Sequence, residues 1–216
     1  PVTLRTMSGA GVLASAQHSQ SLEAWLCHIP GLKVVMPSNP YDAKGLLVAA
    51  VRDDNPVFIV ETKTLIQMEG PVPDGLYEVP IGTAAIARPG TDFTVVATGH
   101  LVGEAQLAAV KLAEEDGIEV EVVDARSLQP LDVETIAGSV RKTHRALVAH
   151  EAVRSYGIGA EIAAQIQEHA FDDLDAPVGR VGAPFSPVPF SPVLEAAYRP
   201  GCSDVVDEVR RILHRS

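Results

Sequence analysis

The sequence predicts an α/β protein with two domains, each built on a parallel sheet, of which the first is incomplete. Strand-like runs alternate with helix-like runs along almost all of the 216 residues, and this alternation is typical of βαβ units. Proline and glycine interrupt the alternation once, at 66–91, where no helical period is present. A chain of this length also fits one to two domains, because a typical domain has roughly 150 residues.

The first series of elements precedes this interruption. Apolar runs predict strands at 2–5, 32–37 and 56–62, and apolar spacings of three and four predict helices at 21–29 and 40–54. The strand PVFIVET at 56–62 is apolar almost throughout, as expected when both faces of a parallel sheet are covered. Pro40 suits the first turn of the second helix. Four apolar residues share one face of the first helix: Leu22, Trp25, Leu26 and Ile29.

A linker and a short initial strand at 66–91 lead to the second series. Strands are predicted at 92–99, 118–126, 145–152 and 177–184, and helices at 100–117, 131–143, 157–171 and 203–215. Gly117 closes the first of these helices, and Asp132 caps the second. The last helix carries an apolar stripe of Val205, Val206, Val209, Ile212 and Leu213. The predicted domains are 1–67 and 83–216, joined by a linker at 68–82.

Composition narrows the class of protein. The formal net charge of −11 argues against a nucleic-acid partner, because phosphate binding depends on clustered Lys and Arg. No apolar run reaches the roughly 18 residues of a membrane span. Cys27 and Cys202 lie far apart without metal-site spacing, which favours a reduced, cytoplasmic setting. The start PVTLRTMSGAG has no initiator methionine and no signal peptide, so we expect a fragment of a longer protein.

The motif YGIGAEI at 156–162 allows two interpretations. A Gly-x-Gly between a strand and a helix is found in dinucleotide cradles. Here Ile162 stands where the fingerprint requires a third glycine or alanine, and no acidic residue closes a following strand at the usual distance. The alternative, tight packing of strand on helix, is therefore favoured.

Histidines other than His18 come next, and two of them are candidates for a functional role. His100 and His150 follow or end predicted strands, where ligand sites of α/β proteins tend to lie, and Glu151 adjoins His150. Each of them is also consistent with a hydrogen-bonded structural residue. His28 lies in a predicted helix and is expected to be packed. No nucleophile elbow, Walker loop, HExxH or paired CxxC is present.

The stretch AAVRDDNPV at 49–57 ends a predicted helix with Asp53 and Asn55, and Pro56 forces the residue before it toward an extended conformation. Free carbonyls at a helix end, with a carboxylate and an amide oxygen, can form a nest for a hard cation. An ordinary helix-to-strand turn explains the same spacing and is favoured by the spacing alone.

His18 stands among glutamines and serines after MSGAGVLASAQ, a segment of small residues too flexible for a core element. A polar loop of this kind suits a site that closes over a substrate, and an imidazole exchanges a proton near neutral pH. The alternative is a hydrogen-bonding cluster that opens the next helix, with Ser19 or Ser21 as its cap. The residues alone leave both interpretations open.

Four segments carry a resemblance to a known family. They are AQHSQSLEAWLCHIPGLKVVMPSNPYDAKGLLVAAVRDDNPVFIVETKTL, VVATGHLVGEAQLAA, EVVDARSLQPLD and LDAPVGRVGAPFSPVPFSPVLEAAYRP. The chain resembles the beta subunit of the thiamine-diphosphate-dependent first component of 2-oxo acid dehydrogenase complexes, which act on pyruvate, branched-chain 2-oxo acids or acetoin. The resemblance implies two three-layer αβα domains: an incomplete pyrimidine-binding domain and a transketolase C-terminal domain, which serves assembly.

The resemblance also implies site residues. His18 matches the family's active-site histidine, which helps to hold the 2-oxo acid and favours acyl transfer to the lipoyl group. A potassium site matches six residues, with backbone carbonyls supplying much of the coordination: Val2, Thr3, Ala50, Val51, Asp53 and Asn55. This implication reverses the preference for an ordinary turn at 49–57.

Two departures from the family pattern limit these expectations. The glutamate that protonates the cofactor's aminopyrimidine ring lies upstream of Pro1 in the family, and neither Glu23 nor any other residue here is assigned that role. The Gly-Asp-Gly motif for diphosphate and magnesium is absent from this sequence and belongs to the alpha subunit in two-subunit members. We therefore expect the isolated chain neither to bind thiamine diphosphate tightly nor to decarboxylate a 2-oxo acid.

The implied partners are an alpha subunit, a second beta subunit and the lipoyl acyltransferase core, with an α2β2 heterotetramer suggested by the family. The implied location is the cytoplasm of a bacterium, or the mitochondrial matrix in a eukaryote. Two other functions stay open: a non-catalytic assembly domain, and a fragment of a single-chain enzyme such as transketolase or deoxyxylulose-phosphate synthase. The dense match around QHSQSLEAW disfavours the last.

Overall fold

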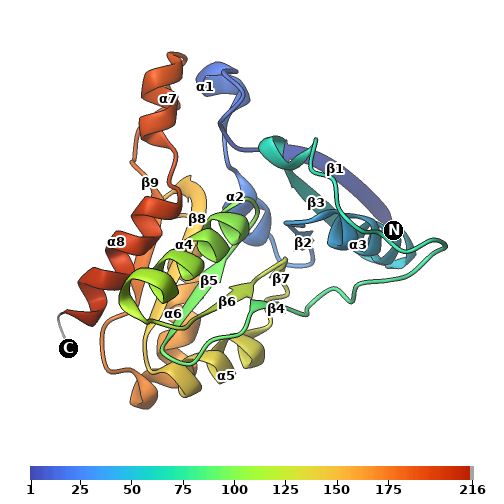
Figure 1. Ribbon diagram of the computed structural model, residues 1–216. Coiled ribbons are helices and arrows are strands. Elements are labelled where there is room, and N and C mark those ends of the chain that lie inside the picture. Colours follow the sequence, from blue (N-terminus) through green and yellow to red (C-terminus); the bar gives the residue numbers. More distant parts are fainter. Residues whose placement is uncertain (215–216) are drawn as a thin grey trace.

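The computed structural model describes residues 1–214 and contains two sheets lying side by side (Figure 1). The strand order of the first sheet is β1-β3-β2-β7, and that of the second is β4-β6-β5-β8-β9. The first sheet comprises β1 Val2–Ser8, β3 Pro56–Thr62, β2 Lys33–Val35 and β7 Ser127–Gln129. The second comprises β4 Ala85–Arg88, β6 Val120–Asp124, β5 Phe93–Ala97, β8 Ala146–Val153 and β9 Gly179–Ala183.

The centres of both sheets are parallel, as the alternation of elements predicts. In the first sheet β3 pairs in parallel with β1 and β2, so that Val2 lies opposite Pro56. In the second sheet β5 pairs in parallel with β6 and β8. One strand in each sheet is antiparallel: β7 on β2 and β4 on β6. The sheets are therefore mixed, and β7 brings a strand from the second half of the chain into the first sheet.

Eight α-helices are formed by residues 1–214. They are α1 Ser15–His18, α2 Glu23–Cys27, α3 Pro40–Arg52, α4 Leu101–Asp116, α5 Val133–Thr143, α6 Ile158–Ala170, α7 Pro192–Tyr198 and α8 Cys202–Leu213. The expected end of α4 is confirmed, because Gly117 adopts the left-handed conformation at φ 68°. The expected cap of α5 is confirmed as well, because Asp132 accepts a 3.1 Å hydrogen bond from the Thr135 N–H. The predicted end of the last helix at residue 215 lies outside the described residues.

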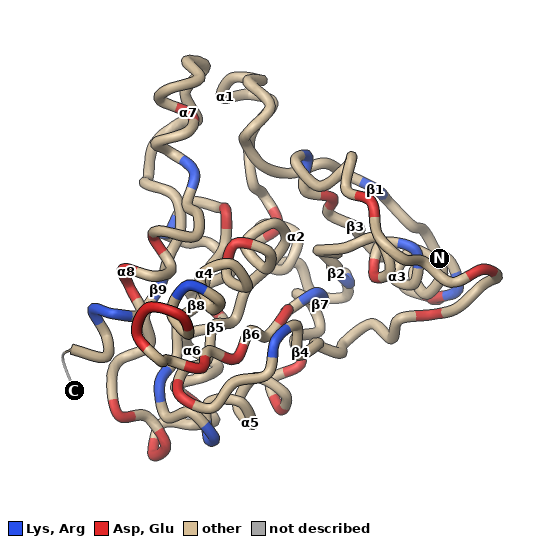
Figure 2. The backbone as a smooth tube through the Cα atoms, in the orientation of Figure 1, with Lys and Arg blue, Asp and Glu red and all other residues tan. Residues whose placement is uncertain are grey.

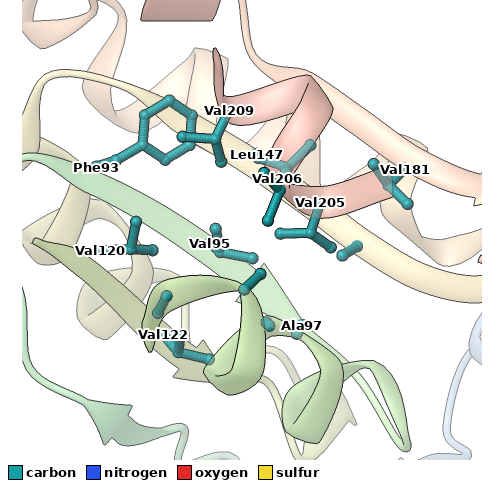
Figure 3. Close-up of a cluster of buried hydrophobic side chains, with 14 of the residues drawn as sticks. Phe93, Val95, Ala97, Val120, Val122, Leu147, Val181, Val205, Val206 and Val209 are labelled. Carbon is teal, nitrogen blue, oxygen red and sulfur yellow. The ribbon is translucent and has the colours of Figure 1, made fainter. Parts of the chain in front are cut away.

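The apolar stripe of α8 packs as expected. Its valines meet Phe93 and Val95 of β5 in a fully buried cluster (Figure 3). A second cluster contains residues of both sheets, because Val34 and Val60 of the first sheet pack with Val96 and Val123 of the second. The two sheets are therefore joined through this second cluster.

Polar contacts also join the two halves. The Arg126 guanidinium, after β6, lies 2.6 Å from Asp42 in the first turn of α3. Ser38 hydrogen-bonds to Asp124, whose pKa is raised to about 7 by burial. The long connection between β3 and β4 lies against α3, since Val79 is buried and the Tyr77 hydroxyl donates to the Tyr41 carbonyl at 2.8 Å.

The α2 helix is present, but its orientation differs from the expectation of a buried apolar face. Trp25 is 71% exposed, and Leu22 and Ile29 are also exposed, whereas Glu23 is only 1% exposed. The prediction that His28 is packed is wrong, because this residue follows the last turn of α2 and lies on the surface. The helix has only five residues, and the side that faces the protein carries Glu23 together with Leu26 and Cys27, which pack against the second cluster.

Neither cysteine is in a disulfide: Cys27 and Cys202 are free thiols. Among the described residues no helix has both the length and the apolar character that crossing a membrane requires.

Candidate functional site

His18 is the last residue of α1 and is exposed. Its ring makes no hydrogen bond or ion pair with any residue that the structure describes. The preceding segment turns sharply: Gly9 and Gly11 have φ of 96° and 93°, and Leu13 has φ of 55°. The imidazole is therefore exposed and is presented by a loop and a single turn of helix, and neither Ser19 nor Ser21 is the cap of α2, which is Leu22.

The chain segment that contains His18 carries no charged side chain. Residues 6–22 and 181–194 contain no Lys, Arg, Asp or Glu, and the tube around α1 is accordingly tan in Figure 2. Helices α1 and α7 project together from the body of the protein (Figure 1). Six large apolar residues of this projection are exposed: Val12, Leu13, Phe185, Phe190, Val193 and Leu194. An exposed apolar surface of this kind is typical of a contact with another protein.

Buried acidic groups lie beneath the loop. Glu23 is fully buried, and burial, with a smaller contribution from Glu151, raises its pKa to about 7. Its carboxylate accepts a 3.4 Å hydrogen bond from the Ser8 hydroxyl at the end of β1. In the second domain the Glu151 carboxylate lies 2.9 Å from Nδ1 of His100. Of these four, only His100 and Glu151 stand out in the sequence as candidates, by their place at strand ends.

His150 has a structural role. Its ring is completely buried, and burial lowers its pKa to about 4. A Cβ atom on Gly159 would lie 2.3 Å from Cδ2 of this ring, and one on Gly157 would lie 2.5 Å from its Cε1. The two glycines are therefore required for close packing of β8 on α6, which supports the packing interpretation of YGIGAEI over a dinucleotide cradle.

The six residues of the expected potassium site come together at one corner. The Thr3 hydroxyl donates a 2.9 Å hydrogen bond to the Ala50 carbonyl, which ties β1 to the last turn of α3. The Asn55 N–H donates to the Asp53 carboxylate at 2.8 Å. A hydrogen bond from Lys33 lowers the pKa of Asp53 to about 2, and Val51 lies in the same last turn as Ala50.

This corner offers carbonyl, hydroxyl and amide oxygens, with one carboxylate that Lys33 already neutralises. Neutral oxygens and little net negative charge suit a monovalent cation, because divalent ions are usually held by several free carboxylates. Within residues 1–214 no group of three or more His, Cys, Asp or Glu is placed to hold a metal ion.

Two cavities of about 510 Å³ lie elsewhere. One is lined by α2 and α6, including His28 and Glu161, and the other by residues at the ends of the first-sheet strands, including Met7 and Thr62. The His18 imidazole is exposed on an open surface and does not line either of these cavities.

Two family models match the chain. Residues 1–68 match the transketolase pyrimidine-binding domain, and residues 82–205 match the transketolase C-terminal domain. The histidine loop and the expected potassium corner lie in the first, and the buried pair His100–Glu151 in the second.

Three curated proteins are similar to this chain over 99% of its length. The acetoin:2,6-dichlorophenolindophenol oxidoreductase subunit beta of Bacillus subtilis is 50% identical. The 2-oxoisovalerate dehydrogenase subunit beta of Pseudomonas aeruginosa and the pyruvate dehydrogenase E1 component subunit beta of Bacillus subtilis are each 44% identical. The chain spans 62%, 64% and 65% of their respective lengths.

A solved structure described as a split gene transketolase, inactive beta4 tetramer, superposes with a TM-score of 0.78 at 27% identity. The superposition covers 99% of this chain and 66% of that one. Fold, domain order and sequence agree, and the chain belongs to the transketolase family, with a pyrimidine-binding domain followed by a C-terminal domain.

Proposed function

We propose that the chain is part of the beta subunit of a thiamine-diphosphate-dependent 2-oxo acid dehydrogenase. Such an enzyme decarboxylates a 2-oxo acid and transfers the acyl group to a lipoyl group. The exposed His18 on its loop carries this proposal, because it combines a reactive side chain with an open surface that another subunit can close. The names of the similar beta subunits give it further support.

His18 would act on the substrate carbonyl. When bound, thiamine diphosphate supplies the carbanion chemistry that breaks the bond to the carboxylate. Negative charge would develop on the keto oxygen when the keto carbon is attacked, before the carboxylate leaves, and a positioned imidazole N–H would stabilise that charge more in the transition state than in the ground state. Because His18 makes no hydrogen bond within residues 1–214, both of its ring nitrogens are available for substrate.

The described residues do not supply a whole cofactor site. Their fit to thiamine diphosphate rests on one contribution, the uncharged surface around His18, which suits the thiazolium end of the cofactor and the apolar part of a 2-oxo acid. The diphosphate, its magnesium ion and the aminopyrimidine ring would be held by residues outside this chain. We infer an alpha subunit as the partner that covers the projection of α1 and α7, with a second beta subunit and the lipoyl acyltransferase core as further partners.

The direct test combines a beta subunit carrying these residues with an alpha subunit, thiamine diphosphate and magnesium. Release of carbon dioxide from carboxyl-labelled pyruvate and branched-chain 2-oxo acids is measured for the mixture and for each subunit alone. We expect release of carbon dioxide from a 2-oxo acid by the mixture and none by this chain alone. A mixture that assembles, binds the cofactor and decarboxylates none of these compounds would contradict the proposal.

We further propose that the corner at 50–55 binds potassium and fixes β1 to the end of α3. The melting temperature is expected to be higher in potassium chloride than in choline chloride at equal ionic strength. Binding at ten times the dissociation constant stabilises the folded state by about 1.4 kcal/mol. The shift should be lost in Asp53→Ala and kept in Asp54→Ala, whose side chain is exposed. Equal melting temperatures in the two salts would refute the site.

A second candidate function is that of a non-catalytic assembly domain that pairs with itself. The exposed apolar residues of α2 and α7 favour it, and the similar transketolase structure is described as an inactive tetramer. Light scattering distinguishes the two functions. A stable oligomer that does not exchange its subunits for an alpha subunit would favour assembly alone.

A further inference from the structure

The loop that leads to His18 is held largely by the second domain, with one 3.3 Å hydrogen bond from Lys63 of the first domain to the Gly9 carbonyl. The Ala10 N–H donates a 2.7 Å hydrogen bond to the Glu151 carboxylate in β8. The Gly11 and Leu13 N–H groups donate to the two oxygens of Glu195 in α7, at 2.9 and 3.2 Å. Three N–H groups within four residues are therefore bound by two carboxylates that lie about 140 and 180 positions further along the chain.

Both carboxylates are buried, with Glu151 4% and Glu195 3% exposed. A hydrogen bond to an ionised acceptor is about twice as strong as one between neutral groups, and burial strengthens it further. The Glu151 carboxylate also lies 2.9 Å from Nδ1 of His100 and 3.8 Å from Nε of the Arg199 guanidinium. Glu151 is thus in contact with its own domain as well as with the loop, whereas both oxygens of Glu195 accept hydrogen bonds from the loop.

The loop needs such an anchor because its backbone is strained. Leu13 and Ser15 have φ of 55° and 63°, a region that side chains other than glycine rarely adopt and that costs on the order of 1 kcal/mol for each residue. Gly9 and Gly11 have no Cβ where the partners lie: a Cβ on Gly9 would be 2.5 Å from Glu151, and one on Gly11 would be 2.7 Å from the Arg199 guanidinium. A strained segment keeps one shape only where its surroundings impose it.

The topology explains why the anchor lies at this place. After β5 the chain forms β6 on one side and later β8 on the other, so the strand order reverses between β5 and β8. Open α/β sheets bind ligands in the crevice at the carboxyl ends of such strands. Here His100 follows β5, Glu151 lies near the end of β8, and the crevice contains Ala10, which is only 1% exposed and packs against Ala183, Val188 and Tyr198.

We infer that Glu151 and Glu195 are positioning residues for His18: the second domain binds the histidine loop in its own ligand crevice and thereby sets the place of the imidazole. This inference rests on the proposed role of His18. It gives the second domain a part in the chemistry, in addition to its expected role in assembly.

Glu195→Gln tests the inference most cleanly, because among residues 1–214 the hydrogen bonds of the Glu195 side chain are those with the loop N–H groups. The amide replaces one acceptor oxygen with an NH2 group that faces an N–H donor, at nearly unchanged volume. A displacement of about 1 Å can lower a rate up to 10²-fold, and we expect kcat for acyl transfer in the assembled enzyme to fall roughly tenfold. Glu114→Gln, exposed on α4, is the matched control and should keep full activity.

A double-mutant cycle separates positioning from a general structural effect. In enzyme that already carries His18→Ala, Glu195→Gln should cause no further loss, because the group that it positions is gone. A further tenfold loss in that background, or full activity of Glu195→Gln alone, would overturn the inference. If His18→Ala itself retains full activity, the proposed function of His18 fails instead, so the two failures are distinguishable.

Amide hydrogen exchange of the chain provides a readout without activity. In Glu195→Gln the Gly11 and Leu13 amides should exchange faster while those of β5 stay protected; unchanged protection of the loop would contradict the inference. If Glu195→Gln does not fold, Gly11→Ala replaces it. The added Cβ meets Arg199 and Thr64 and displaces the loop while both carboxylates remain, and the same cycle with His18→Ala applies.

Discussion

Replacing His18 with alanine should lower the rate of acyl transfer by the assembled enzyme about 10²-fold, the usual scale for a positioned acid–base group. The loss should appear in kcat at saturating 2-oxo acid, because the imidazole stabilises charge that develops only during the reaction. Stability should not change: the side chain is exposed and makes no hydrogen bond within residues 1–214, and surface substitutions of this kind usually stay within about 0.5 kcal/mol.

His169→Ala is the matched control, because this histidine is also exposed but lies at the end of α6, in the second domain. It should have the turnover of the unmodified enzyme. A His18→Ala enzyme with unchanged turnover, or one that melts several degrees lower, would contradict the role given to this residue.

Glu23→Gln should stabilise the protein at and above neutral pH. The native state keeps Glu23 protonated up to a pKa of about 7, whereas the unfolded chain ionises it near 4.5. Between these values the native state binds more protons, so the stability of the unmodified protein falls as pH rises through this window. At 1.36 kcal/mol for each pH unit, the destabilisation above pH 7 amounts to about 3 kcal/mol, and glutamine, which does not ionise, removes it.

Urea unfolding between pH 4.5 and 8 measures this effect. The variant and the unmodified protein should be equally stable near pH 4.5 and diverge up to pH 7, with a constant difference beyond. Glu168→Gln, exposed on α6, should leave the pH dependence unchanged. A Glu23→Gln variant that is less stable at pH 8 would show that the buried carboxylate contributes more as a charged acceptor for Ser8 than its desolvation costs.

Local signals in the sequence predict most of the fold. The β-branched runs, the Asp132 cap, the closing Gly117 and the apolar stripe of α8 each act within a few residues, and the structure contains each of them. Strand β7 has three residues and depends on pairing with β2 from the other half of the chain. No local sequence pattern therefore predicts it. The orientation of α2 likewise depends on the tertiary contacts of Glu23.

The residues of the candidate site were likewise only partly predictable from the sequence. His18 stands out in the sequence because it follows a loop of small residues, and the structure places it on the surface as that pattern predicts. Glu195 in SPVLEAAY has the appearance of an ordinary helical residue, and its partners Gly11 and Leu13 lie more than 180 positions away. Glu151 is predicted only as a neighbour of His150. The role of the Glu151 and Glu195 carboxylates in holding the loop can therefore be recognised only from the three-dimensional structure.

The most direct test of the account is a structure of the assembled alpha and beta subunits with thiamine diphosphate and a non-cleavable 2-oxo acid analogue. The account predicts that the His18 ring lies within hydrogen-bonding distance of the analogue beside the thiazolium ring, with the loop N–H groups still bound to Glu151 and Glu195. A cofactor bound on the far side of the first sheet, with His18 in solvent, would contradict it.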